Sequence, residues 1–291
     1  MYKINFEQPV HVHFIGIGGI SMSGLAEVLL EEHFTISGSD NKRSPLTEQL
    51  EKAGVTIFYG QKASNIIEGI DVVVYTAAIH EDNEEYQAAV QKGLPMLSRA
   101  ELLGQLMTNY DTPIAISGTH GKTTTTSMLS HILLSAEMDP TISVGGILKA
   151  IGGNIRVGNS EIFLTEACEY TNSFLHFFPK IGVILNIDED HLDFFKDLAD
   201  IRHSFRKFAE LLPADGTLVI NGEIPELHEI TDGLACRVVT YGPDSSYDYS
   251  ATNILHDQIG EASFDFVKNG EFVTRIALSV NGDHNVSNAL A

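Results

Sequence analysis

The sequence has few cysteines, no long apolar run and no recognisable leader at its N-terminus. Its two cysteines, Cys168 and Cys236, offer neither a disulfide framework nor a paired metal-binding spacing, which favours a reducing compartment. No apolar run approaches the roughly 18 residues that a membrane-spanning helix needs. The first residues, MYKINFEQPV, lack the charged and apolar regions of a secretory signal peptide. We therefore expect a cytoplasmic protein without membrane insertion.

Basic residues are scarce relative to acidic ones. The 291-residue chain has 18 Lys and Arg against 39 Asp and Glu, which gives a formal net charge of −21. Because proteins hold nucleic-acid backbones mainly with Lys and Arg, this balance argues against general binding of nucleic acid or of an anionic membrane. A small anionic ligand is still compatible, provided that helix N-termini, metal ions and a few cations create local positive potential. The length suits two domains.

The stretch from Pro113 to Met128, PIAISGTHGKTTTTSM, combines an apolar strand, a glycine turn and the start of a helix. Such a turn lets backbone N–H groups surround a polyphosphate, while Lys122 adds a positive charge and Thr123 offers a hydroxyl to a metal ion. The standard pattern would place its first glycine where this chain has Ile116. The first glycine is Gly118, so the loop is a shortened variant. A glycine turn with an incidental lysine is the alternative, which the order of strand, turn and helix disfavours.

Two further expected strands end in side chains that suit a metal ion. Residues 161–165 lead into Glu166, and residues 180–185 lead into the sequence NIDEDHLD, which contains His191. Because the carboxyl ends of parallel strands meet at one edge of a sheet, Glu166 and His191 are expected beside the phosphate loop. With Thr123 they could hold Mg²⁺ ions that bridge phosphate oxygens. Each residue alone could instead be a solvated strand end or helix start, but two strand ends meeting one loop favour the metal site.

The N-terminal part repeats the order of strand, glycine turn and helix. Residues 10–30 contain Gly18 and Gly19 in the turn, but Ser21 stands where a strict dinucleotide fingerprint would have its third glycine. Asp40 follows the next expected strand, where an acid can accept hydrogen bonds from a ribose or a base. Asp40 could equally cap the helix that follows. The motif by itself does not identify the nucleotide.

Strands that alternate with helices predict an α/β fold with parallel sheets. Residues 1–110 are expected to form a Rossmann-like domain. Residues 111–281 are expected to form a P-loop-type ATPase α/β domain with additional antiparallel strands. Residues 282–291 read as the beginning of a helix, and we expect a further C-terminal domain to follow them.

Local turn signals add two expectations for the second half of the chain. Asn269–Gly270, between two strand-like runs, predicts a hairpin turn. The glycine pairs at 145–146 and 152–153 are expected to lie in flexible loops.

Six segments of the chain resemble the Mur ligase family of bacterial peptidoglycan synthesis. They occur in the family's order and span nearly the whole chain: HFIGIGGISMSGLAE, SGSD, GTHGKTTTT, EACEYTNSFL, NIDEDHLD and NGDHNVSNA. The resemblance is greatest to the member that joins L-alanine to UDP-N-acetylmuramate. It implies ATP-dependent amide formation through an acyl phosphate, with ATP and Mg²⁺ as cofactors, in cell-wall precursor synthesis and hence in cell shape and division.

The resemblance also implies roles for individual residues. Those expected on the UDP part of the sugar nucleotide, or near it, are Gly18, Gly19, Asp40 and Ala77. Those expected on the phosphates of ATP are Gly118, Thr119, Gly121, Lys122, Thr123 and Thr124. The residues expected on the Mg²⁺ ions are Thr123, Glu166 and His191, those on the adenine side are His284, Asn285 and Asn288, and His120 is expected near the substrate carboxylate. The catalytic set implied is Lys122, His120, Glu166 and His191.

Two departures from the family pattern qualify these expectations. Several members carry a carbamoylated lysine on the helix after the Asp-His motif, where this chain offers Arg206 and Lys207, so no modified lysine is predicted. The family's third domain, which binds the amino acid and closes over ATP, would follow Ala291. Without it, we expect the chain to bind the sugar nucleotide but to ligate poorly or not at all.

Three alternatives stand beside this interpretation. An NAD-dependent oxidoreductase would explain the first glycine motif, but it has no use for a phosphate loop that carries Lys122. A UDP-sugar-binding fragment without catalysis is the second alternative. The third is the related recycling ligase, which attaches a preformed peptide to the same sugar nucleotide. The first glycine motif argues against this recycling ligase.

Overall fold

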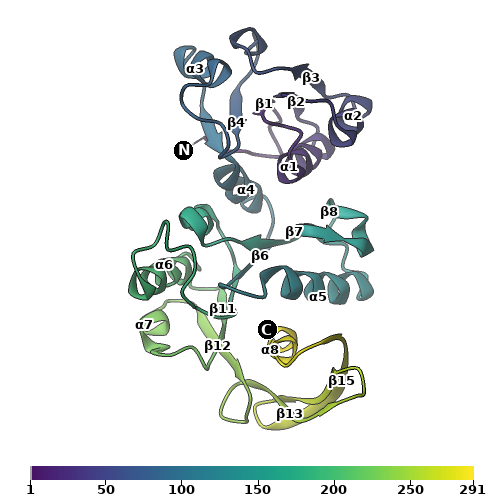
Figure 1. Ribbon diagram of the computed structural model, residues 1–291, viewed down its shortest axis with the longest axis vertical. Coiled ribbons are helices and arrows are strands. Elements are labelled where there is room, and N and C mark those ends of the chain that lie inside the picture. Colours follow the sequence, from purple (N-terminus) through teal and green to yellow (C-terminus); the bar gives the residue numbers. More distant parts are fainter. Residues whose placement is uncertain (1) are drawn as a thin grey trace. The chain divides into compact units, whose positions relative to one another are not determined.

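The computed structural model describes residues 2–291, which divide into two compact units. The first unit contains the described residues up to Tyr110 together with Pro140–Ser160, and the second contains Asp111–Asp139 together with Glu161–Ala291. Their helices and strands are labelled in Figure 1. The segment Pro140–Ser160 therefore belongs to the first unit, although it follows the phosphate loop in the sequence.

The first unit is built on a five-stranded sheet in the order β3-β2-β1-β4-β5, in which every neighbouring pair is parallel. Its strands are β1 (His11–Ile15), β2 (Thr35–Asp40), β3 (Thr56–Tyr59), β4 (Val72–Tyr75) and β5 (Met96–Ser98). The chain crosses from one side of β1 to the other between β3 and β4. This is the strand order of a Rossmann-type nucleotide-binding half, in which ligands bind at the carboxyl ends of the strands where the order reverses. The Rossmann-like fold predicted for this part is confirmed.

Three α-helices connect these strands, α1 (Ile20–Glu31), α2 (Pro45–Lys52) and α3 (Glu84–Gln91), and α4 (Arg99–Met107) follows β5. Helix α2 begins after Ser44, whose hydroxyl accepts the N–H of Thr47 while the Thr47 hydroxyl accepts the N–H of Ser44. This capping box satisfies donors that the first helical turn leaves open. Ser44, rather than Asp40, is therefore the cap of this helix.

Residues 140–160 form a hairpin rather than the flexible loops that the glycine pairs predicted. Strand β7 (Thr141–Leu148) pairs antiparallel with β8 (Gly153–Arg156). A methyl group at Gly24 of α1 would lie 2.8 Å from a side-chain carbon of Ile155. A glycine inside a helix costs about 1 kcal/mol relative to alanine, and here it permits the close approach of β8. The loop prediction was wrong because the hairpin depends on this packing, which has no local signal.

A buried polar network links β1 to α3. His13 and Glu85 are both fully buried, and His13 Nε2 lies 2.6 Å from Glu85 Oε1. The other ring nitrogen of His13 lies 2.8 Å from the hydroxyl of Ser37, which is also 2.8 Å from Nε2 of His11. Because a buried polar group without its partner is costly, this network fixes α3 against the sheet.

The second unit is built on a larger sheet whose strands run in the order β15-β14-β13-β12-β11-β10-β6-β9. They are β6 (Thr112–Ser117), β9 (Ile162–Ala167), β10 (Ile181–Ile184), β11 (Thr217–Asn221), β12 (Arg237–Gly242), β13 (Tyr249–His256), β14 (Glu261–Lys268) and β15 (Glu271–Asn281). The pairs from β9 to β13 are parallel, and the last two pairs are antiparallel. Asn269 and Gly270 have φ values of 50° and 81° in the turn between β14 and β15. The α/β sheet with added antiparallel strands and the Asn-Gly hairpin are therefore confirmed.

The helices of the second unit are α5 (Lys122–Ser135), α6 (Leu198–Glu210), α7 (His228–Thr231) and α8 (His284–Leu290). In Figure 1, α5 and α6 lie to either side of the strands β6 and β11. Leu133 of α5 packs on the apolar cluster that includes Ile116 and Val183. A methyl group at Gly182 would instead meet Phe208 of α6 at 3.4 Å. Adjacent residues of a strand face opposite sides, so the helices cover opposite faces of the sheet.

Shorter elements and surface properties complete the description. The chain has 3₁₀ helices at Ala63–Asn65, Lys149–Ile151 and Tyr170–His176. Within residues 2–291, no helix is both long enough and apolar enough to cross a membrane.

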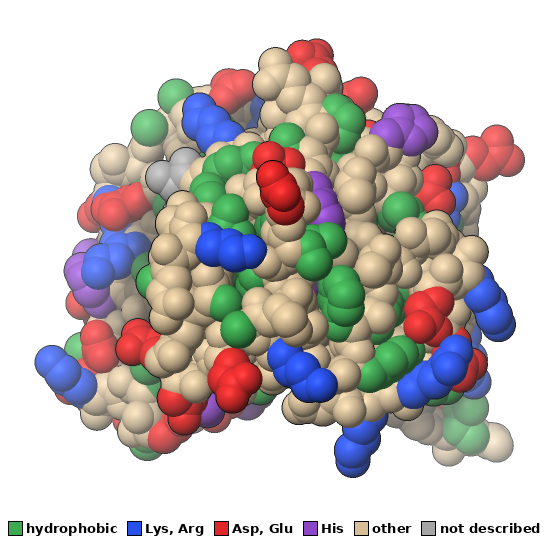
Figure 2. Space-filling model, turned by 90° about the horizontal axis from the view of Figure 1, so that it is seen from above, with side chains coloured by type: hydrophobic (Ala, Val, Ile, Leu, Met, Phe, Trp, Pro, Cys, Tyr) green, Lys and Arg blue, Asp and Glu red, His purple; other side chains and the backbone are tan. Residues whose placement is uncertain are grey.

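On the face drawn in Figure 2, Lys and Arg side chains are spread among Asp and Glu side chains. An anion that binds this acidic chain therefore needs local donors rather than a general positive surface.

The buried His13–Glu85 pair gives a test of the first unit. Replacing Glu85 with alanine should lower the free energy of unfolding by about 2 kcal/mol or more, because it leaves His13 buried without its partner. Urea denaturation followed by circular dichroism measures the effect. The control Glu68→Ala, at an exposed position, should change stability by less than about 0.5 kcal/mol. Equal stability of the two variants would show that the pair does not hold α3 in place.

Candidate functional site

The phosphate loop (residues 117–121) connects β6 to α5, and α5 begins at Lys122. Gly118 has a φ of 141° and Gly121 has a φ of 87°, values that residues with a side chain rarely adopt. A methyl group at Gly118 would lie 2.9 Å from Cβ of Leu185. The order of strand, glycine turn and helix is therefore confirmed, and no other residue type would allow this backbone path.

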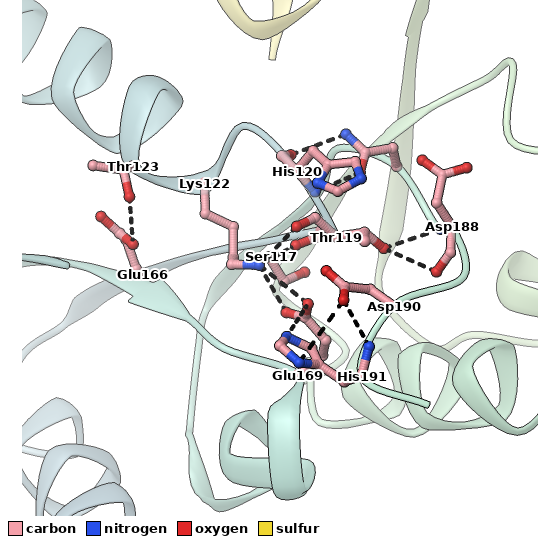
Figure 3. A network of polar contacts seen from close by, with 12 residues as sticks. Ser117, Thr119, His120, Lys122, Thr123, Glu166, Glu169, Asp188, Asp190 and His191 are labelled. Atoms are coloured by element: carbon pink, nitrogen blue, oxygen red, sulfur yellow. Dashed lines mark hydrogen bonds and ion pairs between the residues drawn. The ribbon is translucent and has the colours of Figure 1, made fainter. Parts of the chain in front are cut away.

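The phosphate loop is held by the segment that follows β10. The N–H of His120 donates to Oδ1 of Asn186 at 2.7 Å, and the side-chain amide of Asn186 donates back to the carbonyl of His120 at 2.9 Å. The N–H of Thr119 donates to the carbonyl of Asn186 at 3.1 Å. The N–H of Asp188 donates to the hydroxyl of Thr119 at 2.9 Å, and Figure 3 shows this contact. The loop therefore keeps one shape, as a preorganised anion site requires.

Lys122 lies inside a set of acceptors at this loop. Its Nζ lies 2.5 Å from the carbonyl oxygen of Gly118 and 3.1 Å from that of Thr119. It also lies 2.9 Å and 3.2 Å from the two carboxylate oxygens of Glu169. The side chains of Lys122 and Glu169 are 17% and 2% exposed. This is a largely desolvated ion pair, in which each charge depends on the other.

The expected metal ligands lie at two places in the cluster. The hydroxyl of Thr123 donates to Oε2 of Glu166 at 3.0 Å. His191 lies beside Glu169, with 3.9 Å between its Nε2 and the nearer carboxylate oxygen. Figure 3 shows the Thr123–Glu166 pair on one side of Lys122 and His191 on the other. The structure thus brings Thr123 and Glu166 together, and it groups His191 with Glu169.

His191 is also fixed by its neighbours. Its backbone φ is 52°, a left-handed value that is uncommon away from glycine and often found at functional sites. Its ring lies 4.5 Å from the ring of Tyr170. The Tyr170 hydroxyl donates to Asp193 at 2.7 Å, and this hydrogen bond raises the pKa of Tyr170 above its ordinary value. The phenol therefore remains a protonated donor, and it holds the ring on which His191 packs.

The oxygen donors at the loop suit Mg²⁺ rather than a metal held by protein ligands alone. Within residues 2–291, no group of three or more His, Cys, Asp or Glu side chains could hold a metal ion. Mg²⁺ usually binds through one or two carboxylates, with waters and substrate phosphates completing its shell. The hydroxyl of Thr123 and the carboxylate of Glu166 match that donor set.

The three residues expected on the adenine side lie on or at the start of α8. The side-chain amide of Asn288 donates to Oδ1 of Asn285 at 3.0 Å, and that of Asn285 donates to the carbonyl of Asn281 at 2.7 Å. A methyl group at Gly121 would lie 2.6 Å from Oδ1 of Asn288. His284 is exposed. Helix α8 therefore packs against Gly121, the residue just before α5, with Asn288 next to the phosphate loop.

The glycine turn of the first unit is held by the end of β2. The N–H groups of Gly16 and Ile17 both donate to the carbonyl of Ser39 at 2.9 Å. The N–H of Gly18 donates to Oδ2 of Asp40, also at 2.9 Å. Asp40 therefore shapes the turn in this structure. Ala77, just after β4, and Gly19, after β1, are both exposed. Both lie at the carboxyl edge of the sheet, where Asp40 also lies.

Sequence reasoning missed two residues of the phosphate-loop cluster. Glu169 is the second acid of the run Glu166–Glu169 that follows the expected strand, and its position in that run was the only signal. Asn186 is the first residue after the other expected strand. Glu169 contacts Lys122, which lies 47 positions away in the sequence, and Asn186 contacts His120, which lies 66 positions away. No local sequence pattern identifies partners at such distances.

Comparison with known families gives two matches. The description "Mur ligase family, catalytic domain" matches residues 11–111, and "Mur ligase middle domain" matches residues 116–291. A UDP-N-acetylmuramate–L-alanine ligase of Agathobacter rectalis is 62% identical over 291 residues, which is 100% of this chain and 63% of that protein. The chain thus spans slightly less than two thirds of the length of the curated relatives it matches.

Two solved structures show the same architecture. One is a UDP-N-acetylmuramate:L-alanyl-γ-D-glutamyl-meso-diaminopimelate ligase from Neisseria meningitides, with a TM-score of 0.85 and 31% identity, covering 97% of this chain and 91% of that one. The other is a UDP-N-acetylmuramate-alanine ligase from Thermotoga maritima, with a TM-score of 0.78 and 30% identity, covering 97% of this chain and 63% of that one.

The crowding at Gly121 gives a test of the phosphate loop. Gly121→Ala should weaken MgATP binding by at least about tenfold, because the added methyl displaces either Asn288 or the loop, and small misplacements at such sites are costly. Isothermal titration measures the affinity. Gly233→Ala is the matched control, since Gly233 also has a positive φ, of 73°, and a methyl group added there would meet no other atom within 4 Å. If both variants bind MgATP as the unmodified chain does, the close approach of Asn288 has no role in the site.

Proposed function

The chain belongs to the Mur ligase family, and on that basis we propose that it provides the substrate and nucleotide sites of an enzyme that joins L-alanine to UDP-N-acetylmuramate. The observation that supports this most directly is the 62% identity to an L-alanine ligase over all 291 residues. The phosphate loop with Lys122, and the Thr123–Glu166 pair beside it, supply the chemistry that such a ligase needs.

The two units are proposed to divide the work. The Rossmann-like domain, residues 1–110, would hold the UDP part of the sugar nucleotide at the carboxyl ends of β1, β2 and β4, with Gly18, Gly19, Asp40 and Ala77. The domain expected at residues 111–281, without the segment Pro140–Ser160 that belongs to the first unit, would hold ATP. Residues 282–291 would contribute His284, Asn285 and Asn288 to the adenine side.

The proposed reaction has two steps. A carboxylate oxygen of the sugar nucleotide attacks the γ-phosphorus of ATP, and ADP leaves. The amine nitrogen of L-alanine then attacks the carbonyl carbon of the acyl phosphate, phosphate leaves with the bonding electron pair, and the nitrogen loses a proton. Neither step requires a covalent bond to the protein. What both require is placement of the reacting groups and neutralisation of phosphate charge.

The residues of this chain suit those two requirements. Lys122 and the backbone N–H groups at the start of α5 would neutralise charge on the β- and γ-phosphates, whereas the N–H groups of Thr119 and His120 donate to Asn186. His120, whose backbone is fixed by Asn186 on both sides, would lie near the substrate carboxylate. Thr123, Glu166 and His191 would hold Mg²⁺, which when bound would offset further phosphate charge.

The recycling ligase is the second candidate, because the solved peptide ligase from Neisseria meningitides has the higher TM-score of the two structures, 0.85 against 0.78. Its sequence identity to this chain is 31%, however, compared with 62% for the L-alanine ligase of Agathobacter rectalis. The identity favours L-alanine. A third candidate, binding of the sugar nucleotide without catalysis, predicts binding but no phosphate release.

Binding of the sugar nucleotide is the first test. Isothermal titration of the 291-residue chain with UDP-N-acetylmuramate, with and without MgATP, should show saturable binding to a single site. Asp40→Asn should weaken it, while Asp71→Asn, at an exposed site before β4, should not. No binding by a chain with a cooperative thermal transition would contradict the assignment of the first unit.

Phosphate release tests the reaction. In a form of this chain extended to the length of its relatives, release should require ATP, UDP-N-acetylmuramate and L-alanine together, and the preformed peptide should not replace L-alanine. Lys122→Ala should lower kcat/KM by roughly 10²- to 10³-fold, as removal of one transition-state donor does elsewhere. Lys180→Ala is the control, since Lys180 pairs with Asp215 at 3.3 Å on the surface. Peptide-dependent release would favour the recycling ligase instead.

A further inference from the structure

Lys122 is already paired with an anion in this structure. Its ammonium group has three N–H donors and no acceptor. The acceptors around it are the carbonyl oxygens of Gly118 and Thr119, at 2.5 Å and 3.1 Å, and the carboxylate of Glu169, at 2.9 Å. All three donors therefore have a partner, and a phosphate oxygen can bind Lys122 only if one of these partners gives way.

The carbonyl oxygens of Gly118 and Thr119 are the two partners that would remain bonded to Lys122 when a phosphate binds. They belong to the phosphate loop, whose path is fixed by the left-handed Gly118 and by the hydrogen bonds between Thr119, His120 and Asn186. They cannot move away while the loop keeps its shape. The exchangeable partner is therefore Glu169, whose carboxylate is the one anionic group among the contacts described for Lys122 (Figure 3).

The surroundings of Glu169 make this exchange costly. Its side chain is 2% exposed, so its charge is poorly solvated and depends on Lys122 for compensation. The next cation-capable group is His191, whose Nε2 lies 3.9 Å from Oε1, beyond hydrogen-bond distance. A phosphate that takes the third donor of Lys122 thus competes with a buried carboxylate that, within residues 2–291, has no second partner as close.

We propose that Glu169 is an internal counter-ion that occupies the third donor of Lys122 until a polyphosphate replaces it, and that this competition limits the affinity of the phosphate loop for nucleotide. The inference rests on the proposed function in that the polyphosphate is that of ATP. It adds that nucleotide affinity is set by a contact within the chain as well as by contacts to the nucleotide.

Titration with inorganic tripolyphosphate, without metal or sugar nucleotide, tests the competition directly, and MgATP provides the second probe. Glu169→Gln keeps the shape of the side chain but replaces a charged acceptor with a neutral one, which forms a weaker hydrogen bond. It should therefore bind tripolyphosphate about tenfold more tightly than the unmodified chain. Unchanged or weaker binding would overturn the proposal, since it would mean that Glu169 supports Lys122 instead of competing for it.

A control separates the pair from a general loss of negative charge. Glu189→Gln removes one charge from the exposed segment after β10, where solvent screens it. It should change the affinity for tripolyphosphate by less than about twofold. If it tightens binding as much as Glu169→Gln does, the effect is one of net charge and the counter-ion role is refuted.

A measurement without ligand tests the pair itself. Lys122→Met should lower the thermal midpoint, because it leaves Glu169 buried and unpaired. Adding Glu169→Gln to that variant should restore part of the loss. Additive effects of the two substitutions would show that the pair is not coupled and would overturn the proposal. By contrast, tighter tripolyphosphate binding combined with no binding of UDP-N-acetylmuramate would refute the proposed function and leave the counter-ion role intact.

Discussion

The tight contact between the phosphate loop and the segment after β10 is the constraint on which the second unit depends. Gly118 has room for no side chain against Leu185, and Gly121 has none against Asn288. Asn186 then holds the loop by hydrogen bonds to the backbone of His120. Because three separate parts of the chain meet here, and the N–H groups of Thr119 and His120 donate to Asn186, the backbone of the loop is held in one shape, as anion binding in a preorganised site requires.

A chain with a net charge of −21 can bind an anion only where local groups create a positive potential. Each unit has a glycine turn between a strand and a helix, an arrangement in which backbone N–H groups and the helix N-terminus can supply positive potential. In the first unit, one carboxylate oxygen of Asp40 accepts the N–H of Gly18. In the second unit, Glu169 faces Lys122. Asp40 thus shapes the first turn, and in the counter-ion proposal Glu169 is the anion that an incoming phosphate must displace from Lys122.

The sequence predicted most of the architecture. Alternation of strands and helices identified the parallel sheets, and the Asn269–Gly270 pair identified the final hairpin, because each signal is local. The phosphate loop and its helix were predicted for the same reason. The β7–β8 hairpin was missed, since Gly152 and its neighbours read as a flexible loop and the packing of Ile155 on Gly24 is visible only after folding.

The sequence by itself therefore determined the elements, the family and the residue types that could handle phosphate and Mg²⁺. The tertiary structure decided which of those residues meet. It brought Thr123 to Glu166, grouped His191 with Glu169, and gave Lys122 a partner 47 positions away. The physical reason is that backbone preferences and hydrophobic periodicity act over a few neighbouring residues, whereas ion pairs and hydrogen bonds across a sheet depend on strand order and on the loops that bring distant segments together.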